Sequence, residues 1–175
     1  DLLPEKSERP LLAVCMISQR KVVTTGLAWM SLASGAVKLM EFSGDARTVG
    51  ARLQHELERI VPAEILCGDG AELSPEHEIA HTQRVPDWHF DVVGGHKALL
   101  DQLKVATLTG FGADGLGAAF GAAGALLRYA QSTQGRGLQH VRSLSTETET
   151  EFIGLDAATR RNLELTETIR GQESP

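Results

Sequence analysis

Three strand-like segments follow one another at the start of the chain with only short turns between them. No other feature of the sequence constrains the fold as strongly. Residues 11–18 (LLAVCMIS) are almost all apolar, as expected of a strand that is covered on both faces. Residues 22–33 and 36–42 read as the second and third strands, after polar turns at 18–21 and 34–35. Because turns this short join antiparallel neighbours, the sequence predicts a three-stranded meander.

A helix and a fourth strand are predicted next. Asp45 is a suitable N-cap, and Pro62 marks the end of the helix. Arg52 and Glu56 are one helical turn apart and can form an ion pair. Residues 63–68 (AEILCG) then read as a short strand. The apolar positions of the helix share one face: Val49, Leu53, Leu57 and Ile60.

The resulting order, β-β-β-α-β, also opens the ribonuclease H-like nucleases. It predicts an α/β fold, a mixed sheet flanked by helices. Those nucleases hold a divalent metal with a carboxylate in the middle of the first strand. Residues 11–18 contain no acidic residue. If the fold is of this kind, its metal chemistry has been lost.

The second half of the chain predicts more helix than strand. Residues 69–87 read as a long polar excursion, and residues 88–93 (WHFDVV) lead into a helix at about 95–104. On that helix Lys97, Asp101 and Lys104 share an outer face. The further elements expected are a glycine-rich helix at about 115–132, short strands at 140–145 and 151–155, and a charged helix after Asp156.

Composition limits the possible functions. The chain carries 23 acidic and 17 basic residues, for a net charge of −6, which argues against a mainly electrostatic nucleic-acid binder. The apolar run at 115–127 is too short and too rich in glycine to span a bilayer, and no signal peptide is visible. We therefore expect a cytoplasmic protein without a membrane partner. Cys15 and Cys67, both in strand-like runs, are expected to be buried, reduced thiols.

The segment GFGADG (110–115) spells G-x-G-x-x-G, a pattern that binds dinucleotides when it opens a βαβ unit. Such a unit also needs an acidic residue about 20 positions further on. No Asp or Glu occurs between Asp114 and Glu147. Nucleotide binding through 110–115 is therefore kept only as an alternative.

Three further glycines suggest a packing role instead. Gly117, Gly121 and Gly124 recur at helical spacing and form one stripe without side chains. Such a stripe lets a neighbouring backbone approach closely, and this gain offsets the roughly 1 kcal/mol that each interior glycine costs a helix.

Residues 77–81 (HEIAH) match H-E-x-x-H, in which two histidines one helical turn apart bind zinc and the glutamate activates water. That chemistry needs a stable helix and a third ligand. Here the segment is short, polar and enclosed by Pro75 and Pro86, and His89 could reach the metal only through a tight turn. A zinc-dependent hydrolase is the second enzymatic alternative.

Residues 154–171 (GLDAATRRNLELTETIRG) closely resemble the start of the core domain in the bacterial MutS mismatch-repair proteins. Upstream segments are similar to the MutS connector domain, in the same order and at similar spacing. These segments are GLAWMSLASGAVKLMEF, PAEILCGDG, WHFD, LTGFG, GAAGALLRYAQSTQ and HVRSLS. The resemblance covers essentially all 175 residues.

The resemblance implies a division of the chain into three parts: a linker at 1–10, a ribonuclease H-like connector domain at 11–140, and the start of the core domain at 141–175 with a C-terminal helical extension. The strand order 3-2-1-4-5 of the family would make the strands of Cys15 and Cys67 neighbours, so that the two thiols could lie near each other.

The resemblance also implies what a fragment of this kind lacks. Neither the N-terminal Phe-x-Glu motif that reads a mismatch nor the Walker site that hydrolyses ATP is in this sequence. No catalytic, metal or cofactor site is therefore expected here, and ATP and magnesium would belong to the full-length protein.

By the same resemblance, the full-length protein is an ATP-dependent, dimeric sensor of mismatched DNA. The connector joins its mismatch-binding domain to its core, moves with the ATP state and offers a docking surface to MutL. By position, the helix after WHFD carries that surface, and His96, Lys97 and Asp101 are the residues expected to contact MutL. Other expected partners are the remaining MutS domains and the second subunit, with DNA reached only through the full-length protein. An ordinary solvated helix face is the alternative reading of Lys97, Asp101 and Lys104.

Overall fold

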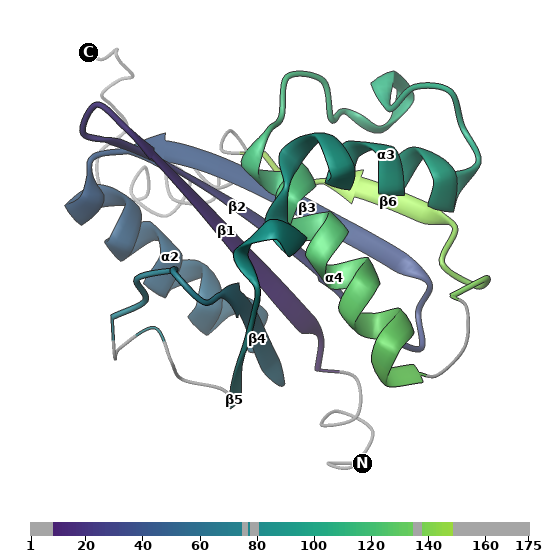
Figure 1. The fold of residues 1–175 in the computed structure, drawn as a ribbon, viewed down its shortest axis with the longest axis horizontal. Helices are drawn as coiled ribbons and strands as arrows, with labels where there is room; N and C mark the ends of the chain where they lie inside the picture. Colours follow the sequence, from purple (N-terminus) through teal and green to yellow (C-terminus); the bar gives the residue numbers. More distant parts are fainter. Residues whose placement is uncertain (1–8, 75–76, 78–80, 135–137, 149–175) are drawn as a thin grey trace, which may run out of the picture.

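A six-stranded mixed sheet organises the residues that the computed structural model describes, which are 9–74, 77, 81–134 and 138–148 (Figure 1). The strand order is β5-β4-β1-β2-β3-β6. The strands are β1 (Leu11–Gln19), β2 (Val22–Met30), β3 (Ala36–Gly44), β4 (Glu64–Gly68), β5 (His81–Val85) and β6 (Ser143–Thr146).

Strand directions confirm the predicted meander. β1, β2 and β3 pair antiparallel, whereas β4 runs parallel to β1, and β5 runs parallel to β4. β6 adds a parallel strand to the other side of β3. The structure confirms the predicted α/β fold, a mixed sheet flanked by helices. The expected strand at 151–155 and the helix after Asp156 lie outside the described residues.

One strand was not predicted from the sequence. Residues 81–85 (HTQRV), which the sequence predicts to be part of a polar excursion, form β5 at the edge of the sheet. None of the five residues is fully buried, so the segment lacks the apolar alternation by which a strand is recognised. Backbone pairing with β4 determines its conformation instead.

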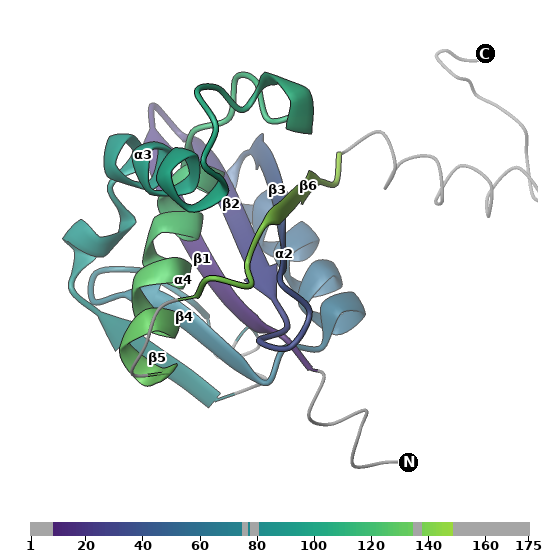
Figure 2. The same ribbon diagram turned by 90° about the vertical axis from the view of Figure 1, so that its right-hand side faces the viewer.

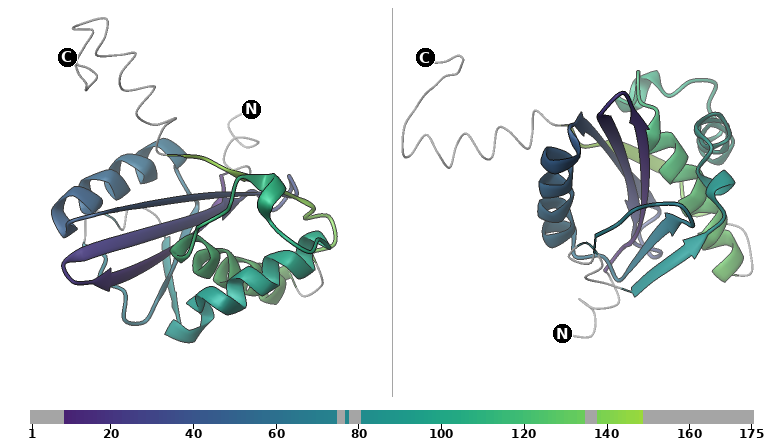
Figure 3. Two further views of the ribbon diagram at one scale, coloured as in Figure 1. Left: turned by 90° about the horizontal axis from the view of Figure 1, so that it is seen from above. Right: turned by 60° about the vertical axis from the view of Figure 1, so that its left-hand side comes forward.

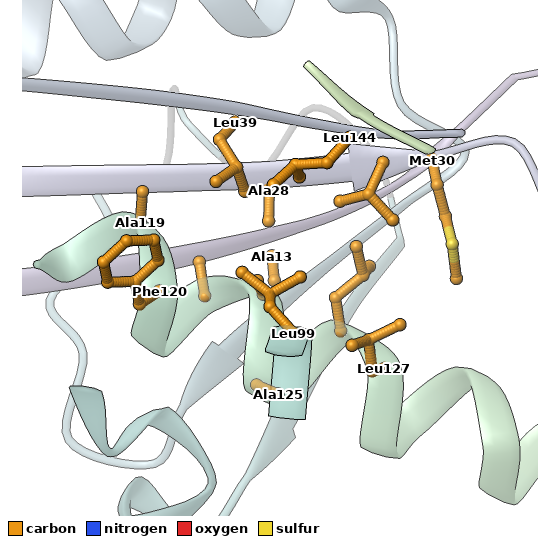
Figure 4. Close-up of a cluster of buried hydrophobic side chains, with 14 of the residues drawn as sticks. Ala13, Ala28, Met30, Leu39, Leu99, Ala119, Phe120, Ala125, Leu127 and Leu144 are labelled. Atoms are coloured by element: carbon orange, nitrogen blue, oxygen red, sulfur yellow. The ribbon is translucent and has the colours of Figure 1, made fainter. Parts of the chain in front are cut away.

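The helices cover the two faces of the sheet (Figures 2 and 3). Helix α2 (Ala46–Ile60) packs on one face, and helices α3 (Val92–Leu103) and α4 (Ala118–Gln134) pack on the other. Alternation along β1 separates two apolar clusters, because Leu12 and Val14 face α2 whereas Ala13 and Cys15 face α4. Figure 4 shows the cluster on the α4 face of the sheet. It combines sheet residues such as Leu39 with Leu99 and Leu127 from the helices.

Small residues bring α4 very close to its neighbours. A Cβ on Gly26 of β2 would overlap the backbone of Ala119, and a Cβ on Gly121 would lie 3.1 Å from Cys15 Sγ. Gly124 meets the backbone of Gly95 on α3. The predicted stripe is therefore confirmed for Gly121 and Gly124.

The first glycine of the predicted stripe behaves differently. Gly117 precedes α4, and no atom would lie within 4 Å of a Cβ placed on it. The prediction that it packs within the helix was wrong.

Two aspartates begin helices. Asp45 Oδ1 accepts a hydrogen bond from Thr48 N–H at 2.8 Å, as expected of an N-cap, and this bond lowers the pKa of Asp45. Asp91 caps α3 in the same way, with 2.7 Å between Oδ2 and the nitrogen of Gly94. Because of this cap, α3 begins at Val92 rather than near residue 95.

The last turn of α2 holds both the segment before β1 and the segment after β6. The guanidinium of Arg9 donates to the carbonyl oxygens of Val61 and Pro62 at 3.2 and 3.0 Å. Arg59 forms an ion pair with Glu147, just after β6, at 2.7 Å. The beginning and the end of the described sheet are thus fixed to one helix terminus.

A buried carboxylate organises the same region. Glu56 is 0% exposed and lies 3.1 Å from Arg52 Nε and 2.7 Å from Arg59 Nη2. The predicted pair of Arg52 and Glu56 is confirmed, but it belongs to a buried network rather than to the helix surface. Arg59 connects this network to Glu147.

Cys15 and Cys67 are buried, and neither forms a disulfide. Their strands, β1 and β4, are neighbours, as the family's strand order implied. Cys15 belongs to the α4 face, whereas Cys67 follows Leu66 of that face and so points to the opposite side. The expectation that the two thiols lie near each other was wrong.

Candidate functional site

Helix α3 carries the three residues predicted to contact a partner, but they do not form one cluster. Lys97 and Asp101 are exposed on the outer side of the helix, four residues apart. His96 lies half-buried, with its ring 4.9 Å from that of Phe120 on α4. Successive helical positions are 100° apart, so His96 and Asp101 lie on opposite flanks of α3.

A cleft of about 500 Å³ lies beside Asp101, between α3, α4 and the 3-10 helix η2 (Asp87–Phe90). Gly94, Gly95 and Gly124 are among its lining residues, and Gly95 meets Gly124 where α3 crosses α4. Trp88 lines one of its walls and is 62% exposed. An exposed tryptophan beside a concave surface is typical of protein interfaces.

Trp88 is held in place by two neighbours. The guanidinium carbon of Arg128, on α4, lies 4.8 Å from the centre of the indole, and the ring of His89 meets it edge-on at 4.3 Å. Desolvation, together with the charge of Arg128, lowers the pKa of His89. Sequence reasoning missed Trp88 and Arg128 as site residues, although a Trp two residues after Pro86 was a visible signal.

The geometry of the HEIAH segment opposes zinc binding. His77 is buried: its Nε2–H donates to the carbonyl oxygen of Gly50 at 2.9 Å, and its Nδ1 accepts from the hydroxyl of Ser74 at 3.0 Å. His81 already belongs to β5, so the two histidines do not share a helix. Both ring nitrogens of His77 fix a loop to α2 instead of offering a lone pair to a metal.

The glycine loop at 110–115 also lacks the geometry of a nucleotide site. Gly112 and Gly115 have φ angles of 72° and 82°, which marks them as turn residues. Glu41 Oε1 accepts hydrogen bonds from the N–H groups of Gly117 and Ala119, both at 2.9 Å. The N-terminus of α4, where a phosphate would bind, is thus occupied by a carboxylate of the protein itself.

Cys15 stands in the middle of β1, a strand that contains no carboxylate. Burial, with a smaller effect of the nearby Glu41 carboxylate, raises the pKa of this thiol to about 11.

Within the described ranges, no group of three or more His, Cys, Asp or Glu side chains could hold a metal ion. The described part of the chain also contains no helix long and apolar enough to cross a membrane.

Comparison with known proteins agrees with the sequence resemblance. Residues 10–142 match the family model described as MutS domain II. A solved structure of T. thermophilus RuvC in complex with a Holliday junction substrate is similar to the chain with a TM-score of 0.45 and 9% sequence identity. That alignment covers 71% of this chain and 96% of the other.

Proposed function

The chain belongs to the MutS family, as its connector domain, and on that premise we propose that it couples the mismatch-binding domain of the full-length protein to the core and ATPase domains, and that it offers a docking surface to MutL. The match over residues 10–142 is the observation that carries this proposal. Binding of mismatched DNA and hydrolysis of ATP with magnesium would be tasks of other parts of a dimeric protein in the cytoplasm. The role proposed for this chain is not catalytic.

The attachment of both ends of the sheet to α2 supports the coupling role. Arg9 precedes β1 and contacts the two residues that follow α2, and Glu147 follows β6 and contacts Arg59 in the last turn of α2. A displacement of either flanking segment would therefore act on the C-terminal end of α2, to which the other segment is also attached.

The outer face of α3 supports the docking role. Lys97 and Asp101 are exposed there, and Val93, one turn before Lys97, is 77% exposed. An apolar side chain between solvated charges suits a transient interface with a polar rim. His96 would contribute indirectly, because its ring packs against Phe120.

Binding of this chain to the N-terminal ATPase domain of MutL tests the docking role. We expect weak, saturable binding by the wild type and at least a tenfold loss in Lys97→Glu. The matched control is Lys38→Glu, which reverses the same charge at an exposed position of β3, on the sheet face opposite α3. Equal affinity of wild type and Lys97→Glu, or no binding by any of them, would contradict a docking surface on α3.

A further inference from the structure

The cleft beside Trp88 has features that neither coupling nor the outer face of α3 explains. The side chain of Trp88 belongs to neither apolar cluster, yet its ring is held by contacts with Arg128 and His89. A large aromatic side chain that is exposed and already held in one position is well suited to bind a partner, because little conformational entropy is lost when the partner covers it.

Glycines make the cleft hollow. Gly94, Gly95 and Gly124 line it, and without their side chains the backbones of α3 and α4 form its floor. Ala98 and Leu127 add apolar surface next to Trp88. At about 500 Å³ the cleft has room for two or three side chains of a partner.

The charged side chains that line the cleft favour the binding of a cationic group. Asp91 and Asp101 line it from α3, and Arg128, which lies over Trp88, is the opposing charge from α4. Asp91 is committed to the N-terminus of α3, whereas Asp101 makes no hydrogen bond or ion pair with any residue that the structure describes. Two carboxylates at the rim repel phosphate, which disfavours nucleic acid and lipid headgroups.

We propose that this cleft binds a protein segment that presents a cationic side chain, directed at Asp101, beside an aliphatic side chain that packs on Trp88, Ala98 and Leu127. The site shares Asp101 with the outer face of α3, but its lining does not include Lys97 or Val93. It goes beyond the proposed function, because it does not require the partner to be MutL.

Intrinsic fluorescence gives a direct test. The chain has two tryptophans, and Trp29 is buried in the cluster on the α2 face, so Trp88 dominates any change that a ligand in the cleft causes. The probe is the capped peptide acetyl-Leu-Arg-Leu-amide, titrated into the wild-type protein. We expect a saturable change in emission with a Kd on the order of 1 mM, which weakens as salt is added.

Three controls make the result specific. Trp88→Phe, at an exposed position, should abolish the change in emission while circular dichroism stays the same. Asp101→Asn should weaken binding about fivefold, as expected for the loss of an exposed charge pair. The peptide acetyl-Leu-Glu-Leu-amide should give no saturable change.

Other outcomes would overturn the proposal. No saturable response to the arginine peptide would show that the cleft is not a receptor of this kind. Equal responses to the arginine and glutamate peptides, or an unchanged affinity in Asp101→Asn, would remove the role of the carboxylate. A saturable response to a short DNA duplex would show that the charge assignment is wrong. None of these outcomes depends on MutL, so they are separate from the test of the docking surface.

Discussion

Gly95 and Gly124 face each other where α3 crosses α4, and a Cβ on Gly124 would lie 2.7 Å from the Cα of Gly95. The contact joins two backbones, so no side chain can turn aside to relieve it. It determines how closely α3 approaches α4 and therefore the depth of the cleft beside Trp88.

Gly124→Ala is expected to destabilise the fold. Alanine has the better helix propensity, but the forced separation of α3 and α4 should outweigh it and lower the free energy of unfolding by about 1–3 kcal/mol. Urea denaturation followed by circular dichroism measures this change. Gly117→Ala is the matched control, because a Cβ there meets nothing within 4 Å and should be tolerated. If both variants lose the same stability, the crossing is not the cause.

Glu41→Ala should destabilise α4 from its first turn. The carboxylate accepts two backbone N–H groups that no other described residue would satisfy, and it lies at the positive end of the helix. We expect a loss of about 1–2 kcal/mol in the free energy of unfolding, measured in urea. Glu41→Gln keeps an acceptor oxygen and should lose less. A larger loss in the glutamine variant would argue against this capping role.

Cys15 should make the stability fall at alkaline pH. Its pKa is about 11 in the folded protein, against an ordinary value of 9.0. Between these values the unfolded chain releases a proton that the folded protein keeps, so the free energy of unfolding decreases as the pH rises through this window, by about 3 kcal/mol in total. Denaturation at a series of pH values, compared with Cys15→Ala, measures the effect.

The same burial should keep the Cys15 thiol unreactive. Only the thiolate attacks an alkylating reagent, so iodoacetamide at neutral pH should modify Cys15 after unfolding and not before. Rapid modification of the native protein at this position would contradict the raised pKa.

Arg59→Ala should loosen β6 without unfolding the sheet. The substitution removes the contact of α2 with Glu147 and leaves Glu56 with Arg52 as its remaining cation. Hydrogen exchange of residues 143–147 should accelerate at least tenfold, while β1 and β2 remain protected. Arg47→Ala, at the other end of α2, is the control. Unchanged exchange at β6 would show that strand pairing alone holds it.

Sequence patterns predicted the central elements because each of them carries a local signal. The apolar run at 11–18, the Asp45 cap and the stripe of α2 needed no tertiary information. β5 was missed because four of its five side chains, at 81–84, are polar and the strand depends on β4 for its conformation. The early start of α3 was missed because two glycines argued against a helix, whereas the Asp91 cap stabilises it.

The candidate site was less accessible to sequence reasoning because it is assembled by the fold. Asp101 and Lys97 were identified as exposed helix positions, and the structure places them there. Arg128 and Trp88 are 40 positions apart, and only the packing of η2 against α4 brings them together beside the cleft. Likewise, no local pattern connects Glu41 to the N-terminus of α4 that it caps.

The contacts of Arg9 and Glu147 with α2 have a mechanical consequence. Tension applied between the segments that precede β1 and follow β6 meets two load paths. One runs across the sheet from β1 through β2 and β3 to β6. The other is a shortcut through the C-terminal end of α2, from the contacts of Arg9 to the ion pair of Arg59 with Glu147. The shortcut is held by an ion pair and carbonyl contacts, so it would yield first and leave the sheet as the elastic element that carries the remaining force.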